Sequence, residues 1–316
     1  MKSLGALVVV ALLGMAALVW SFPDATAERL IALERSRNGL ELKQLQVGER
    51  NWPYLEGGPA NAPVIVMVHG FSADKDNWVR FAGHFVDDYR VIAPDLPGFG
   101  DQKRIPDHDY RLGAQVARLH AFARALNLES FHLVGNSMGG HITALYSLAY
   151  PEQVLSAGLF NNAGIDSPQP SDMEQRLAQG ENPLLTQSVA DFDRILAYTT
   201  QVQPFVPWPV KPYVANKALE AREFNAYIFE QYKSDRSDGL EPVFAQIQPP
   251  VFILWGRQDR VLDVSAVEVM TELRPESRSV ILDDTGHLPM IERPAQTAQF
   301  YQGFLDSLSA AEQAGL

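Results

Sequence analysis

Cysteine is absent from the 316 residues of the chain, and basic side chains are scarce. The absence of cysteine rules out a disulfide scaffold, although it fits any cellular compartment. Lys and Arg number 26 against 38 Asp and Glu, and the formal net charge is −12. A protein without a basic face cannot displace the counterions of a polyanion, so nucleic acid is not an expected partner. For the same reason the soluble part has no electrostatic attraction to an anionic lipid surface.

Internal repeats, low-complexity tracts and charged tails are also missing from the sequence. The seven histidines include no pair at the spacing of zinc ligands, so we predict no metal site. No motif indicates a cofactor. Apolar residues make up 46% of the chain, which is enough for a sizeable core. The length allows either one large domain with an insertion or two domains.

A long apolar run lies near the start of the chain. From Leu4 to Trp20 there are 17 residues without a polar side chain. As a helix this run is roughly 25 Å long, and the next two residues, ending at Phe22, extend it to roughly 29 Å. A bilayer core is about 30 Å thick. We therefore expect a single-pass transmembrane anchor over residues 1–23, with Trp20 and Phe22 as interfacial aromatics.

Two features of the sequence bear on whether this segment is retained and on which way it crosses the membrane. The sequence "ATA" at Ala25–Ala27 is an acceptable signal-peptidase site, so a cleaved signal is the alternative. Lys2 precedes the run, and positive charge stays cytoplasmic, so the rest of the chain is expected to face outward. In a bacterium the anchor would then lie in the inner membrane and the rest of the chain in the periplasm. The lipid bilayer is then a partner. The oligomeric state stays open, with a homodimer through the N-terminal helices as one alternative.

The remaining chain alternates between two kinds of pattern. Residues 24–39 have helical spacing and predict a juxtamembrane amphipathic helix. Continuous apolar runs typical of buried parallel strands then recur in "PVIVMVHG", "YRVIAPDLPG", "FHLVGNS", "VLSAGLFNNAG", "VFILWGRQD" and "SVILDDTGH". Helical patterns separate these runs. The fold class predicted is α/β, with a mostly parallel sheet covered by helices on both faces.

One segment interrupts this alternation. Residues 164–242 contain no buried-strand run, but they have helical stretches at 187–198 and 217–232. We expect a helical cap over the carboxyl edge of the sheet, between core parts 40–163 and 243–316. Four apolar residues of the cap are candidate contacts for a ligand bound in a tunnel beneath it: Phe192, Leu196, Phe205 and Trp208. The alternative is that they only pack the cap onto the core.

The sequence Gly135-Asn136-Ser137-Met138-Gly139 has the pattern G-x-S-x-G. The pattern alone is weak, but here it follows an apolar strand run and begins a helical one, as a nucleophile elbow requires. The two glycines remove side chains that would collide across a tight turn. Ser137 is therefore the predicted nucleophile.

A serine nucleophile needs a base, and the base needs an acid. His287 lies in "DDTGHLPMIERP", just after the last apolar run, where a loop can reach Ser137. Asp259 ends the preceding apolar run and is the preferred acid. Four rivals remain: Asp166, Asp263, Asp283 and Asp284. The order Ser, Asp, His is that of α/β hydrolases.

An oxyanion formed at Ser137 needs two hydrogen-bond donors. The N–H of Met138, directly after the nucleophile, is the first expected donor. The second is expected from the loop after "MVHG", at the N–H of Phe71, where Gly70 allows a close approach.

Five motifs together resemble a known family: "MVHGFSADKDNW", "APDLPGFGD", "GNSMGGH", "LWGRQDRV" and "TGHLPMIERP". They are similar to the lipase and esterase branch of the α/β-hydrolase superfamily, in particular its membrane-anchored, monoacylglycerol-lipase-like members. The resemblance covers roughly residues 42–308 and implies the same triad of Ser137, Asp259 and His287. Asn136 departs from the His that commonly precedes the serine.

The expected function is therefore that of a membrane-anchored serine hydrolase. It would cleave fatty-acyl esters of glycerolipids, as a lipase or phospholipase A does, through an acyl-enzyme. The alternatives are a soluble-substrate esterase or C–C bond hydrolase with the same triad. A non-catalytic ligand receptor on a hydrolase fold is an alternative of another class. Ser137 excludes haloalkane dehalogenases and epoxide hydrolases, which have Asp at that position.

Overall fold

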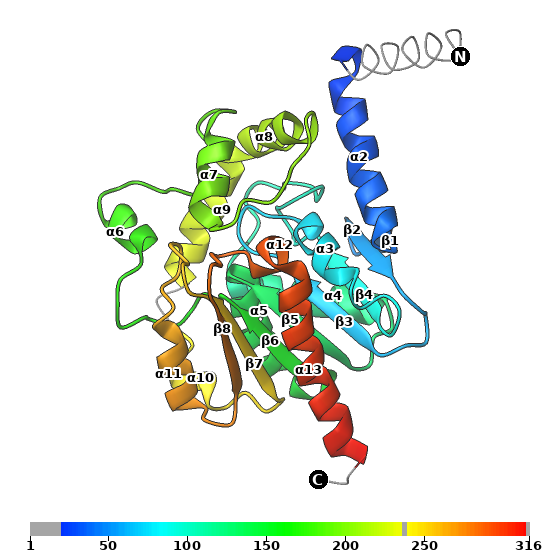
Figure 1. Cartoon of the computed structure of the whole chain (residues 1–316), viewed down its shortest axis with the longest axis vertical. Helices are drawn as coiled ribbons and strands as arrows, with labels where there is room; N and C mark the ends of the chain where they lie inside the picture. Colours follow the sequence, from blue (N-terminus) through cyan, green and yellow to red (C-terminus); the bar gives the residue numbers. More distant parts are fainter. Residues whose placement is uncertain (1–19, 236–238, 314–316) are drawn as a thin grey trace, which may run out of the picture.

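A computed structural model of the chain describes residues 20–235 and 239–313. Its centre is an eight-stranded sheet in the order β1-β2-β4-β3-β5-β6-β7-β8 (Figure 1). β1 pairs with β2, and β2 with β4, in antiparallel fashion, while every other pair is parallel. The prediction of a mostly parallel sheet is confirmed. The strands are β1 (Leu40–Val47), β2 (Arg50–Gly57), β3 (Val64–Val68), β4 (Arg90–Pro94), β5 (Phe131–Asn136), β6 (Val154–Phe160), β7 (Val251–Gly256) and β8 (Arg278–Leu282).

Both faces of the sheet are buried, which explains the unbroken apolar runs. In β3, Val66 and Val68 belong to one hydrophobic cluster, and Ile65 and Met67 belong to the cluster on the opposite face. The first cluster includes residues of α4 (Leu112–Ala125), α5 (Met138–Ala149) and α11 (Ala266–Leu273). The second includes residues of α3 (Val79–Ala82), α12 (Pro289–Glu292) and α13 (Pro294–Gln313). Side chains alternate across the pleat, so each of the parallel strands β3 to β7 contributes to both clusters. β8 lies at the edge of the sheet and is largely exposed, although its sequence predicted a buried strand.

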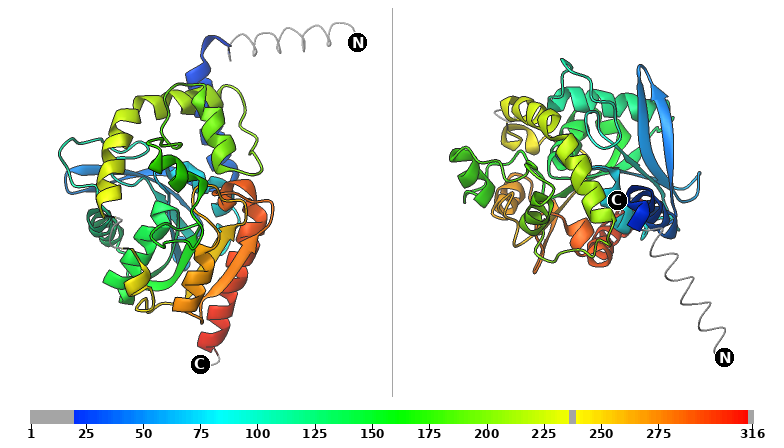
Figure 2. Two further views of the ribbon diagram at one scale, coloured as in Figure 1. Left: turned by 90° about the vertical axis from the view of Figure 1, so that its left-hand side faces the viewer. Right: turned by 90° about the horizontal axis from the view of Figure 1, so that it is seen from above.

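The cap segment enters between β6 and β7 and lies above the edge of the sheet where the parallel strands end (Figures 1 and 2). It contains α6 (Asp172–Ala178), α7 (Asp191–Thr199), α8 (Val210–Glu220) and α9 (Arg222–Asp235). The short helix α10 (Glu241–Phe244) follows and lies beside α11, where the chain returns to the sheet (Figure 1). The predicted helical stretch 217–232 is divided at Ala221, where α8 ends and α9 begins. The change of direction buries Ile228 and Phe229 of α9 in the core cluster, and packing of this kind overrides local helix periodicity.

Helix α2 (Pro23–Arg37) occupies the predicted juxtamembrane segment, and Gly39 follows it with φ of +70°. The left-handed conformation at Gly39 turns the chain from the helix into β1. Few apolar contacts hold this helix, since Leu33 stays 43% exposed. Ion pairs do so instead: Arg35 binds both carboxylate oxygens of Asp76, and Glu34 binds Arg80. Figure 1 shows α2 running from the edge of the sheet at β1 up to the level of the cap helices α7 and α8.

Within residues 20–235 and 239–313, no helix is long and apolar enough to cross a membrane. The predicted anchor over residues 1–23 falls almost entirely outside the part of the chain that the structure describes.

Candidate active site

Ser137 lies on a sharp turn between β5 and α5, with φ of +58° and ψ of −124°. A positive φ is unfavourable for a residue with a side chain, and the turn keeps it because the surrounding backbone is firmly bonded. The Ser137 N–H donates to the carbonyl of Phe160, and the Ser137 carbonyl accepts from the N–H groups of His141 and Ala163. The strand–turn–helix context predicted for this motif is therefore present.

The glycines on either side of Ser137 occupy positions at which a side chain would clash with the backbone. A Cβ on Gly139 would lie 2.2 Å from the carbonyl oxygen of Val68, and one on Gly135 would lie 2.1 Å from the carbonyl oxygen of Gly139. Both distances are far below van der Waals contact. The spacing of glycines in the motif thus follows from the close packing of β5, α5 and the end of β3.

His287 and Asp259 face each other at the carboxyl ends of β8 and β7. Nδ1 of His287 lies 2.7 Å from Oδ2 of Asp259, and both side chains are almost fully buried. Oδ1 of Asp259 accepts from the backbone N–H groups of Val261 and Leu262. Because an ionised carboxylate only accepts hydrogen bonds, Nδ1 of His287 is the donor, and in the neutral imidazole Nε2 is then the acceptor.

The structure distinguishes Asp259 from its four rivals. Asp263 accepts from the N–H and hydroxyl groups of Ser265, in the turn that precedes α11. The other three rivals are exposed to solvent: Asp166, Asp283 and Asp284. Of the five acids, Asp259 is the one that contacts the imidazole of His287.

Two asparagines that sequence reasoning gave no role connect the three loops. Asn136, directly before the serine, donates to the backbone carbonyl of His287 at 3.0 Å. Asn161, directly after β6, donates to Oδ2 of Asp259 at 2.7 Å and to the carbonyl of Gly286 at 3.3 Å. The serine, histidine and aspartate loops are therefore brought together. The one indication for Asn161 in the sequence was its position, as a polar residue directly after a buried strand.

Glu292 is a second site residue that the sequence did not reveal. Its buried carboxylate accepts from the N–H groups of Gly286 and Leu288, which flank His287. It also accepts from the N–H groups of Gln201 and Val202 in the cap. A single carboxylate thus fastens the histidine loop to the segment that follows α7.

The loop after β3 approaches Ser137 from the other side. A Cβ on Gly70 would lie 3.0 Å from Cβ of Ser137 and 3.5 Å from its Oγ, so only glycine brings the backbone this close. The next residue is Phe71, whose ring packs against Phe99 at 5.7 Å. Met138 is the first residue of α5, and the first N–H groups of a helix have no partner within it.

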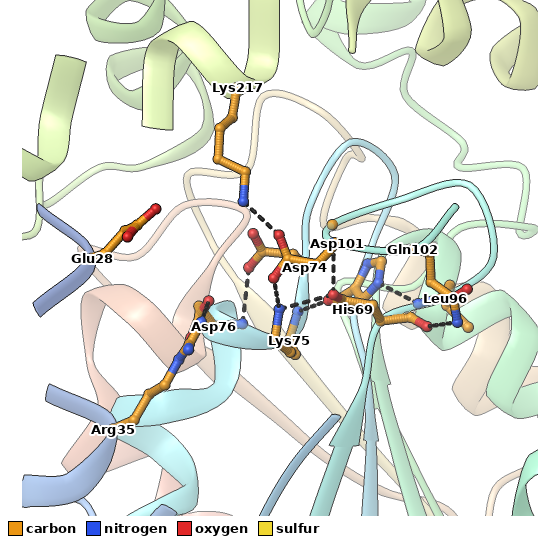
Figure 3. A network of polar contacts seen from close by, with 12 residues as sticks. Glu28, Arg35, His69, Asp74, Lys75, Asp76, Leu96, Asp101, Gln102 and Lys217 are labelled. Atoms are coloured by element: carbon orange, nitrogen blue, oxygen red, sulfur yellow. Dashed lines mark hydrogen bonds and ion pairs between the residues drawn. The ribbon is translucent and has the colours of Figure 1, made fainter. Parts of the chain in front are cut away.

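His69 holds this loop in place. Its Nδ1 bonds to the carbonyl of Gly70, and its Nε2 accepts from the N–H of Leu96 (Figure 3). The side chain is fully buried, and this burial lowers the pKa of His69 to about 4. A neutral imidazole is the form that can donate at one nitrogen and accept at the other.

The four apolar cap residues fall into two groups. Phe192 and Leu196 are half-buried on α7, and the carbonyl of Thr199 at the end of this helix accepts from the N–H of His287. Phe205 and Trp208 are 79% and 51% exposed. The substrate-binding role stays a prediction for all four, with the first pair lying on the helix that touches the histidine loop.

A hollow of about 470 Å³ lies between α2 and α8, away from the serine and histidine loops. Its lining includes Asp24 of α2 together with Tyr213 and Lys217 of α8, and none of the predicted triad residues. It is a feature of the contact between helix α2 and the cap.

The comparisons with known proteins agree with this geometry. A model of the alpha/beta hydrolase fold matches residues 63–294. Lipase 1 of Psychrobacter immobilis is 33% identical over 288 residues, which cover 90% of each sequence. The monoacylglycerol lipase ABHD6 of Bos taurus is 29% identical over 285 residues, which cover 87% of this chain and 85% of that protein.

A solved structure extends the similarity over nearly the whole chain. It is that of a membrane phospholipase A described as a bacterial virulence factor, with 44% identity and a TM-score of 0.89. The match covers 98% of this chain and 99% of that one. The family resemblance read from the five sequence motifs is thereby confirmed. The chain belongs to the α/β-hydrolase family, within which it is an ester hydrolase of the lipase and esterase kind.

Proposed function

We propose that Ser137, His287 and Asp259 form the catalytic triad of a serine esterase. The observation that carries this proposal is the 2.7 Å contact between His287 and Asp259, on a loop bonded to the residue before Ser137. Nε2 of His287 accepts the proton of the Ser137 hydroxyl as its oxygen attacks the ester carbonyl. Asp259 keeps the imidazole in the required tautomer and stabilises its positive charge.

The attack converts the ester carbonyl into a tetrahedral oxyanion. The N–H groups of Met138 and Phe71 are the proposed donors to this oxygen, and removing one such donor typically costs ~10²–10³ in kcat. His287 then protonates the leaving alcohol, which departs and leaves an acyl-enzyme on Ser137. Water, deprotonated by the same imidazole, releases the fatty acid and restores the enzyme.

The proposed substrate is a fatty-acyl ester of a glycerolipid, including phospholipid. The named activities of the relatives, monoacylglycerol lipase and phospholipase A, support this class. We assign residues 164–242 to a cap that covers the acyl chain, with Phe192 and Leu196 of α7 as the contacts nearest to the histidine loop. Each methylene withdrawn from water contributes about 0.8 kcal/mol, so an apolar site under the cap favours medium and long chains over acetyl.

We further propose that residues 1–23 anchor the enzyme in a bacterial inner membrane, with the catalytic domain in the periplasm. Exposed aromatic side chains next to the proposed anchor support this arrangement. Trp20 and Phe22 of the N-terminal segment are 77% and 60% exposed, and the ring of Trp20 lies 5.2 Å from that of Trp208 in the cap. Exposed Trp and Phe side chains are typical of surfaces that contact the interfacial region of a bilayer.

The experiment that tests this function measures hydrolysis of p-nitrophenyl esters from acetyl to palmitoyl, beside intact phospholipids in mixed micelles. We expect kcat/KM to rise with chain length and fatty acid to be released from phospholipid. An enzyme that prefers acetyl esters and leaves phospholipids intact would be a small-ester or C–C bond hydrolase instead. A protein that hydrolyses none of these esters would be a ligand receptor.

A further inference from the structure

The loop that carries Phe71 contacts the cap at two separate points. At the first, Nδ2 of Asn225 in α9 donates to the hydroxyl of Ser72 at 2.9 Å. Asn225 is 5% exposed, and Ser72 has φ of +57°, which a residue with a side chain adopts only under constraint. The ring of Phe229, one turn further along α9, packs against Phe71 at 5.3 Å.

The second contact runs through Lys75, which begins the short 3₁₀ helix η1 (Lys75–Trp78) at the end of the same loop. The side chain of Lys75 is 1% exposed, and its ammonium group lies 2.8 Å from Oδ2 of Asp95 and 2.7 Å from Oδ2 of Asp101 (Figure 3). The backbone N–H of Lys75 donates to the other oxygen of Asp95. Two carboxylates therefore determine where the end of this loop lies.

Asp101 is shared between the loop and the cap. Its Oδ1 accepts from the ammonium group of Lys217 in α8 at 2.6 Å, while its Oδ2 accepts from Lys75 (Figure 3). Burial opposes ionisation of Asp101, but the charges of Lys75 and Lys217 outweigh it and hold its pKa well below the usual range. The bridge Lys217–Asp101–Lys75 is thus charged at neutral pH.

An ion pair with side chains as exposed as those of Asp101 and Lys217 contributes little to stability. The pair can still fix the position of the loop, because Asp101 also binds the buried ammonium group of Lys75. A displacement of the reacting geometry by about 1 Å can cost ~10²-fold in rate. The bridge and the contact between Asn225 and Ser72 are therefore suited to setting geometry rather than stability.

We propose that Lys217 and Asn225 are positioning residues through which the cap holds the loop of Phe71 in its catalytic geometry. The oxyanion hole is complete only while α8 and α9 are packed on the core. This inference rests on the proposed function and extends it. The cap would position an oxyanion donor in addition to covering the substrate.

The test compares Lys217→Met and Asn225→Ala with the full-length wild-type enzyme in detergent. The substrate is p-nitrophenyl butanoate, whose short acyl chain has little contact with the cap, and rates are expressed per active site titrated with a phosphonate. We expect kcat to fall about tenfold in each variant while KM changes by less than about twofold, because the lost interaction acts in the transition state. Lys217→Arg keeps the bridge and should restore most of the rate.

Lys211→Met is the matched control. Lys211 lies on the same helix α8 and is about as exposed, but its partner Asp193 belongs to the cap itself. This variant should retain wild-type kcat. The second readout is inhibition by an alkyl trifluoromethyl ketone, which binds as an oxyanion. Its inhibition constant should rise in proportion to the loss of kcat/KM in Lys217→Met and Asn225→Ala.

The inference is overturned if Lys217→Met and Asn225→Ala behave like Lys211→Met. It is also overturned if their losses appear in KM while the inhibition constant for the ketone is unchanged. A different result would contradict the proposed function itself: Ser137→Ala would hydrolyse esters at the wild-type rate.

Discussion

Nδ1 of His287 lies 2.7 Å from Oδ2 of Asp259, and the two residues are 28 positions apart in the chain. The parallel sheet explains the contact, because β7 and β8 are neighbours and their carboxyl ends open at the same edge. The histidine loop is also bonded to Asn136, which places it beside the serine turn. The remaining contacts of the site serve to hold these loops.

Asp259→Asn should lower kcat for ester hydrolysis by several orders of magnitude. An amide at this position can donate to Nδ1 of His287, which would favour the tautomer that cannot accept the serine proton at Nε2. The measurement is steady-state kinetics with p-nitrophenyl butanoate. Asp263→Asn is the control, since Asp263 binds Ser265 in the turn before α11 and should be dispensable for the reaction. Equal losses in the two variants would disprove the assignment of the acid.

Glu292→Gln should destabilise the protein and reduce kcat. The carboxylate accepts from backbone N–H groups of both the histidine loop and the cap, and the amide nitrogen of Gln would face some of these donors. Hydrogen bonds to a charged group are worth about 1.5–3 kcal/mol, so a loss of that size in the free energy of unfolding is expected. Urea unfolding and kcat are measured on the same samples. Unchanged stability would mean that Glu292 does not hold these segments.

Protonation of His69 should contribute to the pH dependence of the free energy of unfolding. Its pKa of about 4 in the folded protein lies below the ordinary value of 6.5. The contribution is fully present above pH 6.5 and is lost as pH falls toward 4, since the unfolded chain binds a proton that the folded protein does not. The expected slope is up to about 1.4 kcal/mol per pH unit.

Unfolding measured from pH 7 to pH 4 in wild type and His69→Gln isolates this contribution. The variant is less stable at pH 7, but its stability should fall less steeply with acid. Parallel curves for the two proteins would show that His69 is not kept neutral by the fold.

Trp208→Ala should reduce turnover of long-chain lipids in vesicles more than turnover of short soluble esters. Trp208 is half exposed beside Trp20, where a bilayer surface or a long acyl chain can contact it. We expect a loss of about tenfold on vesicles, equivalent to about 1.4 kcal/mol of apolar contact. Leu155→Ala is the control, because this residue is 39% exposed on β6, away from the cap. Equal effects of Trp208→Ala on both substrates would exclude the lipid contact.

Sequence patterns predicted the sheet and the three loops of the proposed triad because each depends on local order. An apolar run followed by a polar turn marks the end of a parallel strand, and parallel strands open at one edge. The division of the helical stretch at Ala221 was not predicted, because helical spacing continues across it while burial of α9 decides its direction.

The supporting residues could not be predicted because their partners are remote in the chain. Asn225 and Ser72 are 153 positions apart, and Asn136 and His287 are 151 apart. Nothing near Asn225 marks it as different from a polar surface residue, and the motif "TGHLPMIERP" does not indicate that the carboxylate of Glu292 is buried. Only the folded chain brings these residues to their partners, within the core for Asn136 and between cap and core for Asn225.

The central claim is that Ser137 is the nucleophile of an ester hydrolase, and covalent labelling tests it most directly. The full-length enzyme is treated with a p-nitrophenyl alkylphosphonate, and the modified peptide is identified by mass spectrometry beside kinetics of Ser137→Ala. We predict one adduct per chain, located on Ser137, and a loss of several orders of magnitude in kcat for the variant. An adduct on another residue, or an unlabelled wild-type enzyme beside a Ser137→Ala variant that still hydrolyses esters, would contradict the account.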